Sequence, residues 1–278
     1  MQKVLLTADD YGMCPEVDEA IEKLAEYGTL STTNVLTNFN TDFTNSPLKN
    51  KENFSIGIHW NVTTGRPVTD PQKIPTLVKE NGDFYSIDEF RYRYRKGLID
   101  AKDLRTELLN QYDIYYKYFG VPEYWNSHEN SALYPKEFKV FESVALEKGI
   151  KCTRNFQRVY IDYENCVGFK RKLREFIVKT FVDYWFGVRV KRKFTMPSGR
   201  IITFKNITKT NPDKLRRALE NTKKPSVEIV IHPAIRGDNP LFGNIGQDRV
   251  VEYNSFMSQE FYDILENENR TIVSFEKL

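Results

Sequence analysis

Two adjacent aspartates follow a hydrophobic run near the start of the chain. Residues 3–8 read Lys-Val-Leu-Leu-Thr-Ala, which is typical of a buried strand, and Asp9 and Asp10 come directly after them. Repulsion and desolvation both oppose the ionisation of two like charges at such a place. We therefore expect a positive partner nearby, and a bound metal cation would supply it.

The chain contains three histidines, and each lies near the carboxyl end of an expected strand. His59 lies in Ile-Gly-Ile-His-Trp-Asn, His128 in Trp-Asn-Ser-His-Glu-Asn and His232 in Ile-Val-Ile-His-Pro. A single histidine at a strand end is more often structural than functional. In a parallel (β/α) barrel, however, all such strand ends meet on one face, together with the aspartates. One carboxylate and two imidazoles suit a divalent metal with open positions for water and substrate. The spacing leaves open which metal binds and which acid binds it.

Strands and helices alternate along most of the chain. Residues 15–28 show helical spacing of apolar residues and end at Gly28, and the β-branched run 29–37 completes a strand–helix–strand unit. Further strands are expected at 54–62, 122–128, 151–156, 227–233 and 271–278, and further helices at 99–118, 135–150 and 256–268. This alternation predicts one (β/α) barrel domain over residues 1–278.

Residues 157–212 fit this pattern poorly and form a basic, aromatic insertion. The run 170–193 holds nine basic and two acidic residues among many aromatic ones. It is either a helix that packs on the barrel or a basic amphipathic segment on anionic lipid. We favour packing, because most amphipathic helices cover a core. Residues 189–204 are expected to form a hairpin that turns at 197–199.

The composition excludes several classes of protein. A net charge of +3 does not indicate binding to nucleic acid. Cys14, Cys152 and Cys166 have no regular spacing, which argues against a disulfide framework or a cysteine zinc site. We see neither a signal peptide nor an apolar run long enough to span a membrane, so we expect a cytoplasmic protein.

Several motifs in order resemble the ChbG/YdjC-like carbohydrate deacetylases, a group that includes hopanoid-associated sugar deacetylases. The matching stretches are ADDYG (8–12), GIHWNVTTGRPV (57–68), SHEN (127–130), ALEKGIKCTR (145–154) and IVIHPA (229–234). The second stretch is the most specific, because it is long and close to the usual form in the family. The family often has a second histidine soon after the SH position, and HPG where this chain has His-Pro-Ala.

The resemblance implies a distorted, polysaccharide-deacetylase-like (β/α) barrel with one divalent metal ion, zinc or magnesium foremost. By that pattern Asp10, His59 and His128 hold the metal. Asp9 is the general base that acts on water, and His232 is the general acid. The implied reaction is hydrolysis of the N-acetyl group of an amino sugar, which releases acetate.

Four residues are candidates for binding the substrate, namely Asn61, Arg66, Asn130 and Arg154. Asn61 and Arg66 lie just past His59, and the resemblance favours the pocket for Arg154. Asn61 could instead cap a turn, Arg66 could be a surface charge, and Arg154 could pair with a surface acid. Family members are often dimers, although nothing in this sequence requires a homodimer.

Three other interpretations stay open. A different hydrolase on the same scaffold, such as a phosphoesterase, usually needs more carboxylates and two metals. A sugar-binding protein without activity would need neither Asp9 nor His232. A membrane-surface protein that uses residues 170–193 to reach lipid-linked sugars is compatible with deacetylation.

Overall fold

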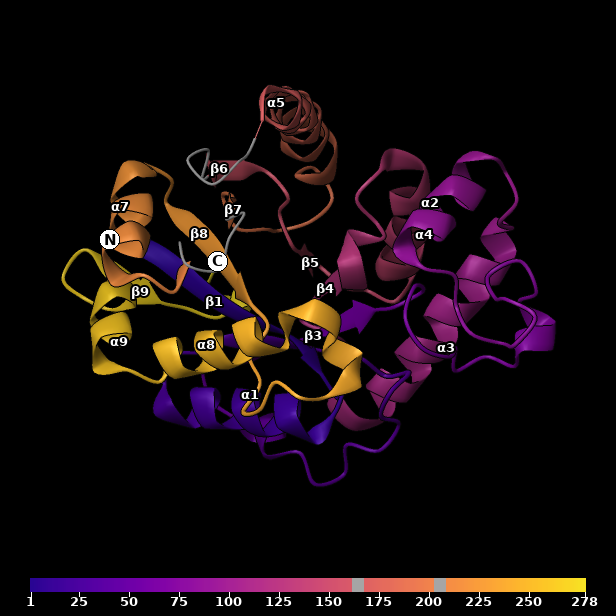
Figure 1. Ribbon diagram of the computed structural model, residues 1–278, viewed down its shortest axis with the longest axis horizontal. Coiled ribbons are helices and arrows are strands. Elements are labelled where there is room, and N and C mark those ends of the chain that lie inside the picture. The colour runs from indigo at the N-terminus through magenta and orange to yellow at the C-terminus, as the bar shows by residue number, and fades with distance from the viewer. Residues whose placement is uncertain (162–167, 203–208) are drawn as a thin grey trace.

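The chain folds around a parallel β-sheet, seen here in a computed structural model that describes residues 1–161, 168–202 and 209–278 (Figure 1). Every ladder that pairs two of its strands is parallel. The strands are β1 (Gln2–Tyr11), β2 (Thr32–Val35), β3 (Ser55–Trp60), β4 (Tyr124–Ser127), β5 (Cys152–Thr153), β6 (Arg158–Ile161), β7 (Arg200–Ile202), β8 (Ser226–Ile231) and β9 (Arg270–Ile272).

The sheet curves into a half-barrel. Its strand order is β5-β4-β3-β2-β1-β8-β7-β6, and β9 pairs with the first residues of β1. The two end strands, β5 and β6, follow each other in the chain, yet no ladder joins them within the described residues. The expected distorted (β/α) barrel is therefore confirmed, with its opening between β5 and β6.

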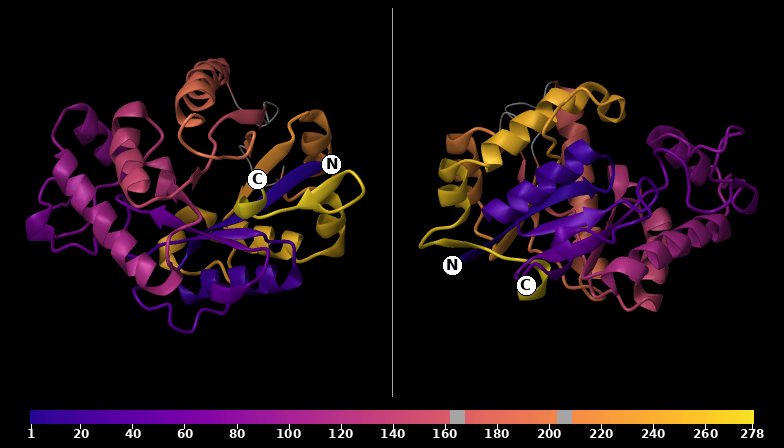
Figure 2. Two further views of the ribbon diagram at one scale, coloured as in Figure 1. Left: turned by 180° about the vertical axis from the view of Figure 1, so that it is seen from behind. Right: turned by 90° about the horizontal axis from the view of Figure 1, so that it is seen from below.

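Helices cover the outside of the sheet. Figure 1 and the two further views in Figure 2 show α1 and α8 together and α2, α3 and α4 in a second group. The helices are α1 (Pro15–Tyr27), α2 (Ile87–Arg95), α3 (Ala101–Phe119), α4 (Pro135–Glu147), α5 (Phe169–Tyr184), α7 (Pro212–Asn221), α8 (Gly246–Phe256) and α9 (Gln259–Leu265). Across the described ranges, none of these helices has the length and apolar character that crossing a bilayer requires.

Strand alternation separates the core from the inside of the half-barrel. In the β3–β4 ladder, His59 lies opposite Asn126, while Trp60 and Trp125 point to the other face. The ring centroids of the two tryptophans lie 5.5 Å apart, and the centroid of Trp125 lies 5.2 Å from that of Phe138 on α4. The aromatic core thus supports the same two strands that present polar groups inward.

Three expected elements are wrong in extent or kind. The helix expected at 256–268 is shorter, α9 alone (Gln259–Leu265), because α8 ends at Phe256 and Ser258 caps the start of α9 by accepting a hydrogen bond from the backbone of Phe261. The final strand is only Arg270–Ile272, and a 3-10 turn follows it. The described part of the hairpin expected at 189–204, residues 189–202, contains no antiparallel pair of strands. Instead, β7 pairs in parallel with β6 and β8.

The basic aromatic run 170–193 forms α5 and a π-helical continuation (Trp185–Val190). Its expected packing is confirmed for one face, where Val182, Phe186 and Val190 are buried. It is wrong for the opposite face, which is exposed. Parts of the expected insertion, 162–167 and 203–208, lie outside the described residues, as does Cys166. Cys14 and Cys152 are free thiols.

A partly buried carboxyl group, that of Asp18, fixes the turn between β1 and α1. The backbone N–H of Gly12 donates to Asp18 Oδ1 at 2.5 Å. Gly12 has a φ of 94°, and a Cβ there would lie 2.9 Å from the carbonyl oxygen of Leu36, so this turn requires glycine. Desolvation, together with repulsion from Glu22, raises the pKa of Asp18 to about 7, although the hydrogen bond from Gly12 opposes it.

This raised pKa predicts a pH-dependent stability that Asp18→Asn removes. The folded-state pKa lies above the unfolded value of 3.8, so the protonated acid is favoured by folding and stability falls as the pH rises from about 4 to about 7. At pH 8 we expect Asp18→Asn to be more stable than the wild type by about 2–4 kcal/mol, and at pH 4 nearly equal to it. Urea unfolding at both pH values measures the difference, and parallel pH profiles for the two proteins would contradict the prediction.

Candidate active site

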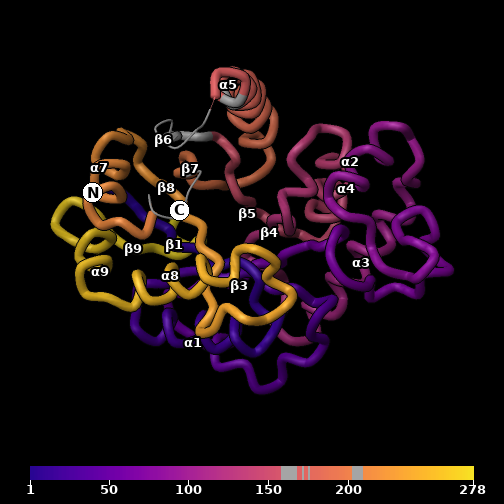
Figure 3. Tube along the Cα trace, in the orientation of Figure 1, coloured from indigo at the N-terminus to yellow at the C-terminus, as the bar shows by residue number. Residues whose placement is uncertain are grey.

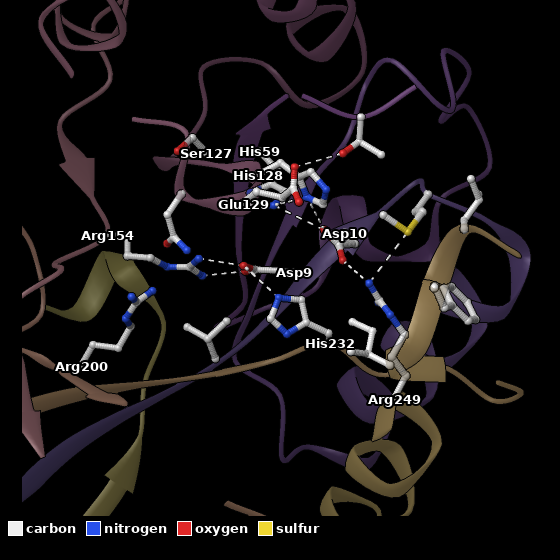
Figure 4. Close-up of a pocket in the computed structure, with 18 of the residues that line it drawn as sticks. Asp9, Asp10, His59, Ser127, His128, Glu129, Arg154, Arg200, His232 and Arg249 are labelled. Atoms are coloured by element: carbon white, nitrogen blue, oxygen red, sulfur yellow. Dashed lines mark hydrogen bonds and ion pairs between the residues drawn. The ribbon is translucent and has the colours of Figure 1, made fainter. Parts of the chain in front are cut away.

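A β-bulge lets two adjacent aspartates face the same site. The β1–β2 ladder pairs Ala8 with Thr33 and Tyr11 with Val35, so β1 holds one extra residue between these pairs. Asp10 has a φ of 80°, in the left-handed region. Regular alternation would turn Asp9 and Asp10 to opposite faces, whereas the bulge turns both toward the inside of the half-barrel (Figure 4).

Arg154 neutralises Asp9. Its guanidinium donates to both carboxylate oxygens, with Nη1 at 2.7 Å from Oδ2 and Nη2 at 2.6 Å from Oδ1. Its Nε donates to Glu228 at 2.9 Å, and Asn34 donates to Asp9 Oδ1 at 2.6 Å. Burial alone would raise the pKa of Asp9, but Arg154 outweighs burial and holds this pKa well below its usual range. Asp9 is therefore ionised at neutral pH.

Arg249 of α8 neutralises Asp10 in the same way. Its Nη2 donates to Asp10 Oδ2 at 2.7 Å, and both side chains are buried. Burial opposes ionisation of Asp10, but His128 and Arg249 together outweigh it and hold the pKa of Asp10 well below its ordinary value. The positive partners expected from the sequence are therefore, first of all, two buried arginines.

The second oxygen of Asp10 meets two imidazoles. Its Oδ1 lies 3.0 Å from His128 Nδ1 and 3.4 Å from His59 Nε2, and the two ring nitrogens are 3.3 Å apart. Zinc bonded at about 2.0–2.1 Å in a tetrahedron holds its ligand atoms about 3.3 Å from one another. The three atoms thus have the separations of a metal face, and this cluster can hold a divalent ion.

Asn126 lies behind His59 and orients its ring. The Asn126 amide contacts His59 Nδ1, on the ring edge opposite Asp10. When its nitrogen faces His59, its oxygen accepts from Asn34 at 2.9 Å and from Arg154 at 3.0 Å. Such a partner on the far nitrogen is what orients a metal-binding histidine.

His232 approaches Asp9 from the end of β8. Its Nε2 lies 3.8 Å from Asp9 Oδ2, and 38% of its side chain is exposed. Its backbone N–H donates to Glu252 Oε2 at 2.6 Å, and Glu252 is also paired with Lys209. Desolvation lowers the pKa of His232 to about 4, while the carboxylates of Asp10 and Asp9 oppose this shift.

The loop after His128 is strained and held from outside. Glu129 and Asn130 both have positive φ values, of 51° and 53°. Arg91 of α2 donates to both of their carbonyl oxygens at 3.3 Å.

Burial lowers the pKa of His128, but the Asp10 carboxylate outweighs burial and raises this pKa overall.

The two aspartates, the three histidines, Arg154 and Arg249 line one cavity of about 450 Å³ at the carboxyl ends of the strands. The size suits a small ligand. Asp9, Asp10, His59, Arg154 and Arg249 are its buried charged and imidazole groups, and Asn130, Arg200 and Phe242 also line it. A metal face next to a carboxylate and an imidazole can hydrolyse a polarised carbonyl or phosphoryl group.

Comparison with known proteins identifies the family. A model of the YdjC-like proteins matches residues 3–267. The chain belongs to the YdjC-like family. A protein named carbohydrate deacetylase from Clostridium beijerinckii is 22% identical over 280 residues, which cover 99% of this chain and 100% of that one.

Other relatives of this YdjC-like chain match over a shorter stretch. A carbohydrate deacetylase of Danio rerio is 27% identical over 153 residues, 55% of this chain and 49% of that protein. The chain matches only about half the length of several such curated relatives. A solved structure from Enterococcus faecalis V583, provisionally described as a cellobiose-phosphate cleavage protein, superposes with a TM-score of 0.74. It is 18% identical, over 99% of this chain and 98% of that one, and shares the fold.

The structure of the YdjC-like chain brings together seven of the nine residues singled out from the sequence. The other two, Asn61 and Arg66, are not among the described residues that line the cavity. Asn61 is buried and caps its own loop, accepting from the backbone of Thr63 at 3.0 Å. Arg66 is a surface charge paired with Asp83. Arg154 does line the cavity, but its guanidinium is engaged by Asp9 and Glu228.

Sequence reasoning missed Arg249 and Glu252. They lie three residues apart on α8, one turn of the helix, and contact Asp10 and His232 respectively. No motif marks them, and the chain separates Arg249 from Asp10 by 239 residues. Only the contact of the α8 side chains with the strand ends reveals them.

The buried Arg154–Asp9 pair predicts a large loss of stability in Arg154→Met. Removing the cation leaves two buried carboxylates, Asp9 and Glu228, without their partner. We therefore expect the free energy of unfolding to fall by about 3–5 kcal/mol. The pKa of Asp9 should rise with it. Chemical denaturation measures the first effect.

Arg66→Met is the matched control, because Arg66 forms an exposed pair with Asp83. We expect it to cost about 0–1 kcal/mol. Equal losses in the two variants would mean that the buried pair contributes no more than the surface pair. Adding Asp9→Asn to Arg154→Met should cost less than the two single changes combined.

Proposed function

We propose that this chain is a metal-dependent hydrolase that removes the N-acetyl group from an N-acetylated amino sugar and releases acetate. The observation that carries the proposal is the position of the Asp10–His59–His128 face beside Asp9 and His232 in one cavity. The relatives named carbohydrate deacetylase support the same reaction and a sugar substrate.

Asp10, His59 and His128 would hold the ion, and two imidazoles in the donor set favour zinc over magnesium. When bound, such an ion polarises a carbonyl oxygen and lowers the pKa of a water molecule toward neutrality. Arg249 engages Asp10 Oδ2 and thereby leaves Oδ1 to face the two histidines. This division of the carboxylate fits a site that takes one ion.

Asp9 and His232 would move the protons. Asp9 stays ionised because of Arg154, and its Oδ2, on the His232 side, would accept a proton from the attacking water. The new C–O bond forms at the acetyl carbon as the C–N bond breaks. His232, whose lowered pKa keeps it neutral beforehand, would take over the proton that Asp9 accepted and donate it to the departing nitrogen, so that the products are acetate and a free amine. Asn130 on the outer wall is the remaining candidate for contact with the sugar.

Acetate release from N,N′-diacetylchitobiose and a panel of N-acetylated sugars tests this function. With zinc added we expect turnover, and in Asp9→Asn a rate lower by about 10²–10⁴-fold, because the proton acceptor is lost. Asp83→Asn, which changes an exposed carboxylate, should keep the wild-type rate.

The outcomes separate the alternatives. Turnover that survives Asp9→Asn would remove Asp9 as the base but keep the activity. Absence of acetate from every sugar, with metal and sugar both bound, would favour a binding protein. Phosphate release in place of acetate would indicate a phosphoesterase.

Metal binding gives an independent prediction. We expect about one zinc ion per chain after dialysis, and His128→Ala should lose most of it because one of three protein ligands is removed. His232→Ala is the matched control and should keep the metal, since His232 is not in the Asp10–His59–His128 cluster. Elemental analysis measures both, and two ions per chain would contradict the single-metal site.

A further inference from the structure

Helix α5 carries apolar side chains on two opposite faces. Val182, together with Phe186 and Val190 of the π-helical continuation, is buried in the core, and Val178 packs against it. A second set, spaced three or four residues apart, is exposed to solvent: Phe169, Leu173, Phe176, Ile177, Phe181 and Tyr184. At 100° per residue these six side chains form one continuous stripe opposite the buried face. We call it the α5 stripe.

The α5 stripe is not covered by the described part of the chain. Figures 1 and 3 show α5 at the edge of the molecule, apart from the other helices. Phe169, at its start, is 79% exposed. Monomeric proteins rarely leave a contiguous apolar surface of this kind in water without using it. The surroundings of the stripe indicate what kind of partner it fits.

Positive charges border the α5 stripe on both sides. By helical position, Arg174 lies along one edge and Lys172 along the other, where Lys179 is paired with Asp183, and Lys170 projects from the first turn of the stripe itself. Residues 170–193 have a net charge of +7 in a chain whose total is +3, so the rest of the chain is net negative. The basic charge of this protein is thus concentrated in the segment that carries the α5 stripe, although four of its nine basic residues lie beyond α5.

We propose that α5 lies on the surface of an anionic lipid membrane. The α5 stripe would enter the boundary between headgroups and acyl chains, and the bordering lysine and arginine side chains would reach the lipid phosphates. The opposite face of the same helix stays packed on the protein. This inference does not depend on the proposed deacetylase reaction.

Charge argues against a second copy of the chain as the partner. Two α5 stripes that pack on each other would bring basic borders together, and like charges in contact oppose association. Asp183 of α5 is already paired with Lys179 of the same helix. Anionic lipid, by contrast, complements both the apolar stripe and its borders.

Flotation of the full chain with vesicles tests the proposal, using pure phosphatidylcholine and phosphatidylcholine mixed with phosphatidylglycerol. We expect binding to the mixed vesicles only, and weaker binding as salt increases. Leu173→Asp should abolish binding, because it places a charge in the middle of the stripe. Lys170→Gln should weaken it about fivefold. No substrate is present, so the result is independent of acetate release.

Leu146→Asp is the matched control. Leu146 on α4 is 45% exposed and Leu173 is 47% exposed, so both substitutions remove a half-exposed helical leucine. Thermal melts check that both variants fold, and Leu146→Asp should bind vesicles like the wild type. Absence of binding to the mixed vesicles, or equal binding by Leu173→Asp, would overturn the proposal. A dimer that Leu173→Asp dissociates, without vesicle binding, would assign the stripe to a second copy.

Discussion

The pairing of each buried aspartate with its own arginine is the interaction on which the site depends. Asp9 and Asp10 are adjacent and buried, and neither would stay ionised there without compensation. Arg154 comes from the segment after β5 and Arg249 from α8, so the two cations arrive from opposite sides. Each engages one carboxylate, and the aspartates can therefore differ in role although they are neighbours in sequence.

The same pairing joins distant parts of the chain. Arg154 also bonds Glu228 of β8, and α8 contacts both Asp10 and, through Glu252, the backbone of His232. Buried charges are costly to separate, so these contacts couple the geometry of the site to the stability of the half-barrel. The site is consequently built into the core of the fold.

The sequence predicts the parts of this arrangement that follow from strand periodicity. His59, His128 and His232 mark strand ends, and parallel strands must bring such ends together. Arg249 and Glu252 escape prediction because an arginine or glutamate on a helix looks like a solvated charge until its partner is known. Asn61 and Arg66 were placed by their nearness to His59 in sequence, but the loop after β3 turns them away from the cavity. The hairpin expected at 189–204 is wrong in its described part because a local turn signal does not say which strands will pair, and the partners of β7 are β6 and β8, outside this segment.

The bulge in β1 also defines what kind of sequence change this site can tolerate. A single extra residue in the strand determines that the side chains of Asp9 and Asp10 point to the same side. Deleting it would restore strict alternation and send one carboxylate into the helical layer, whatever the side chains were. A substitution changes the contacts of one aspartate, whereas a deletion or insertion at the bulge would change the contacts of both Asp9 and Asp10. The site is thus specified by the residue count of one strand as firmly as by the identity of its residues.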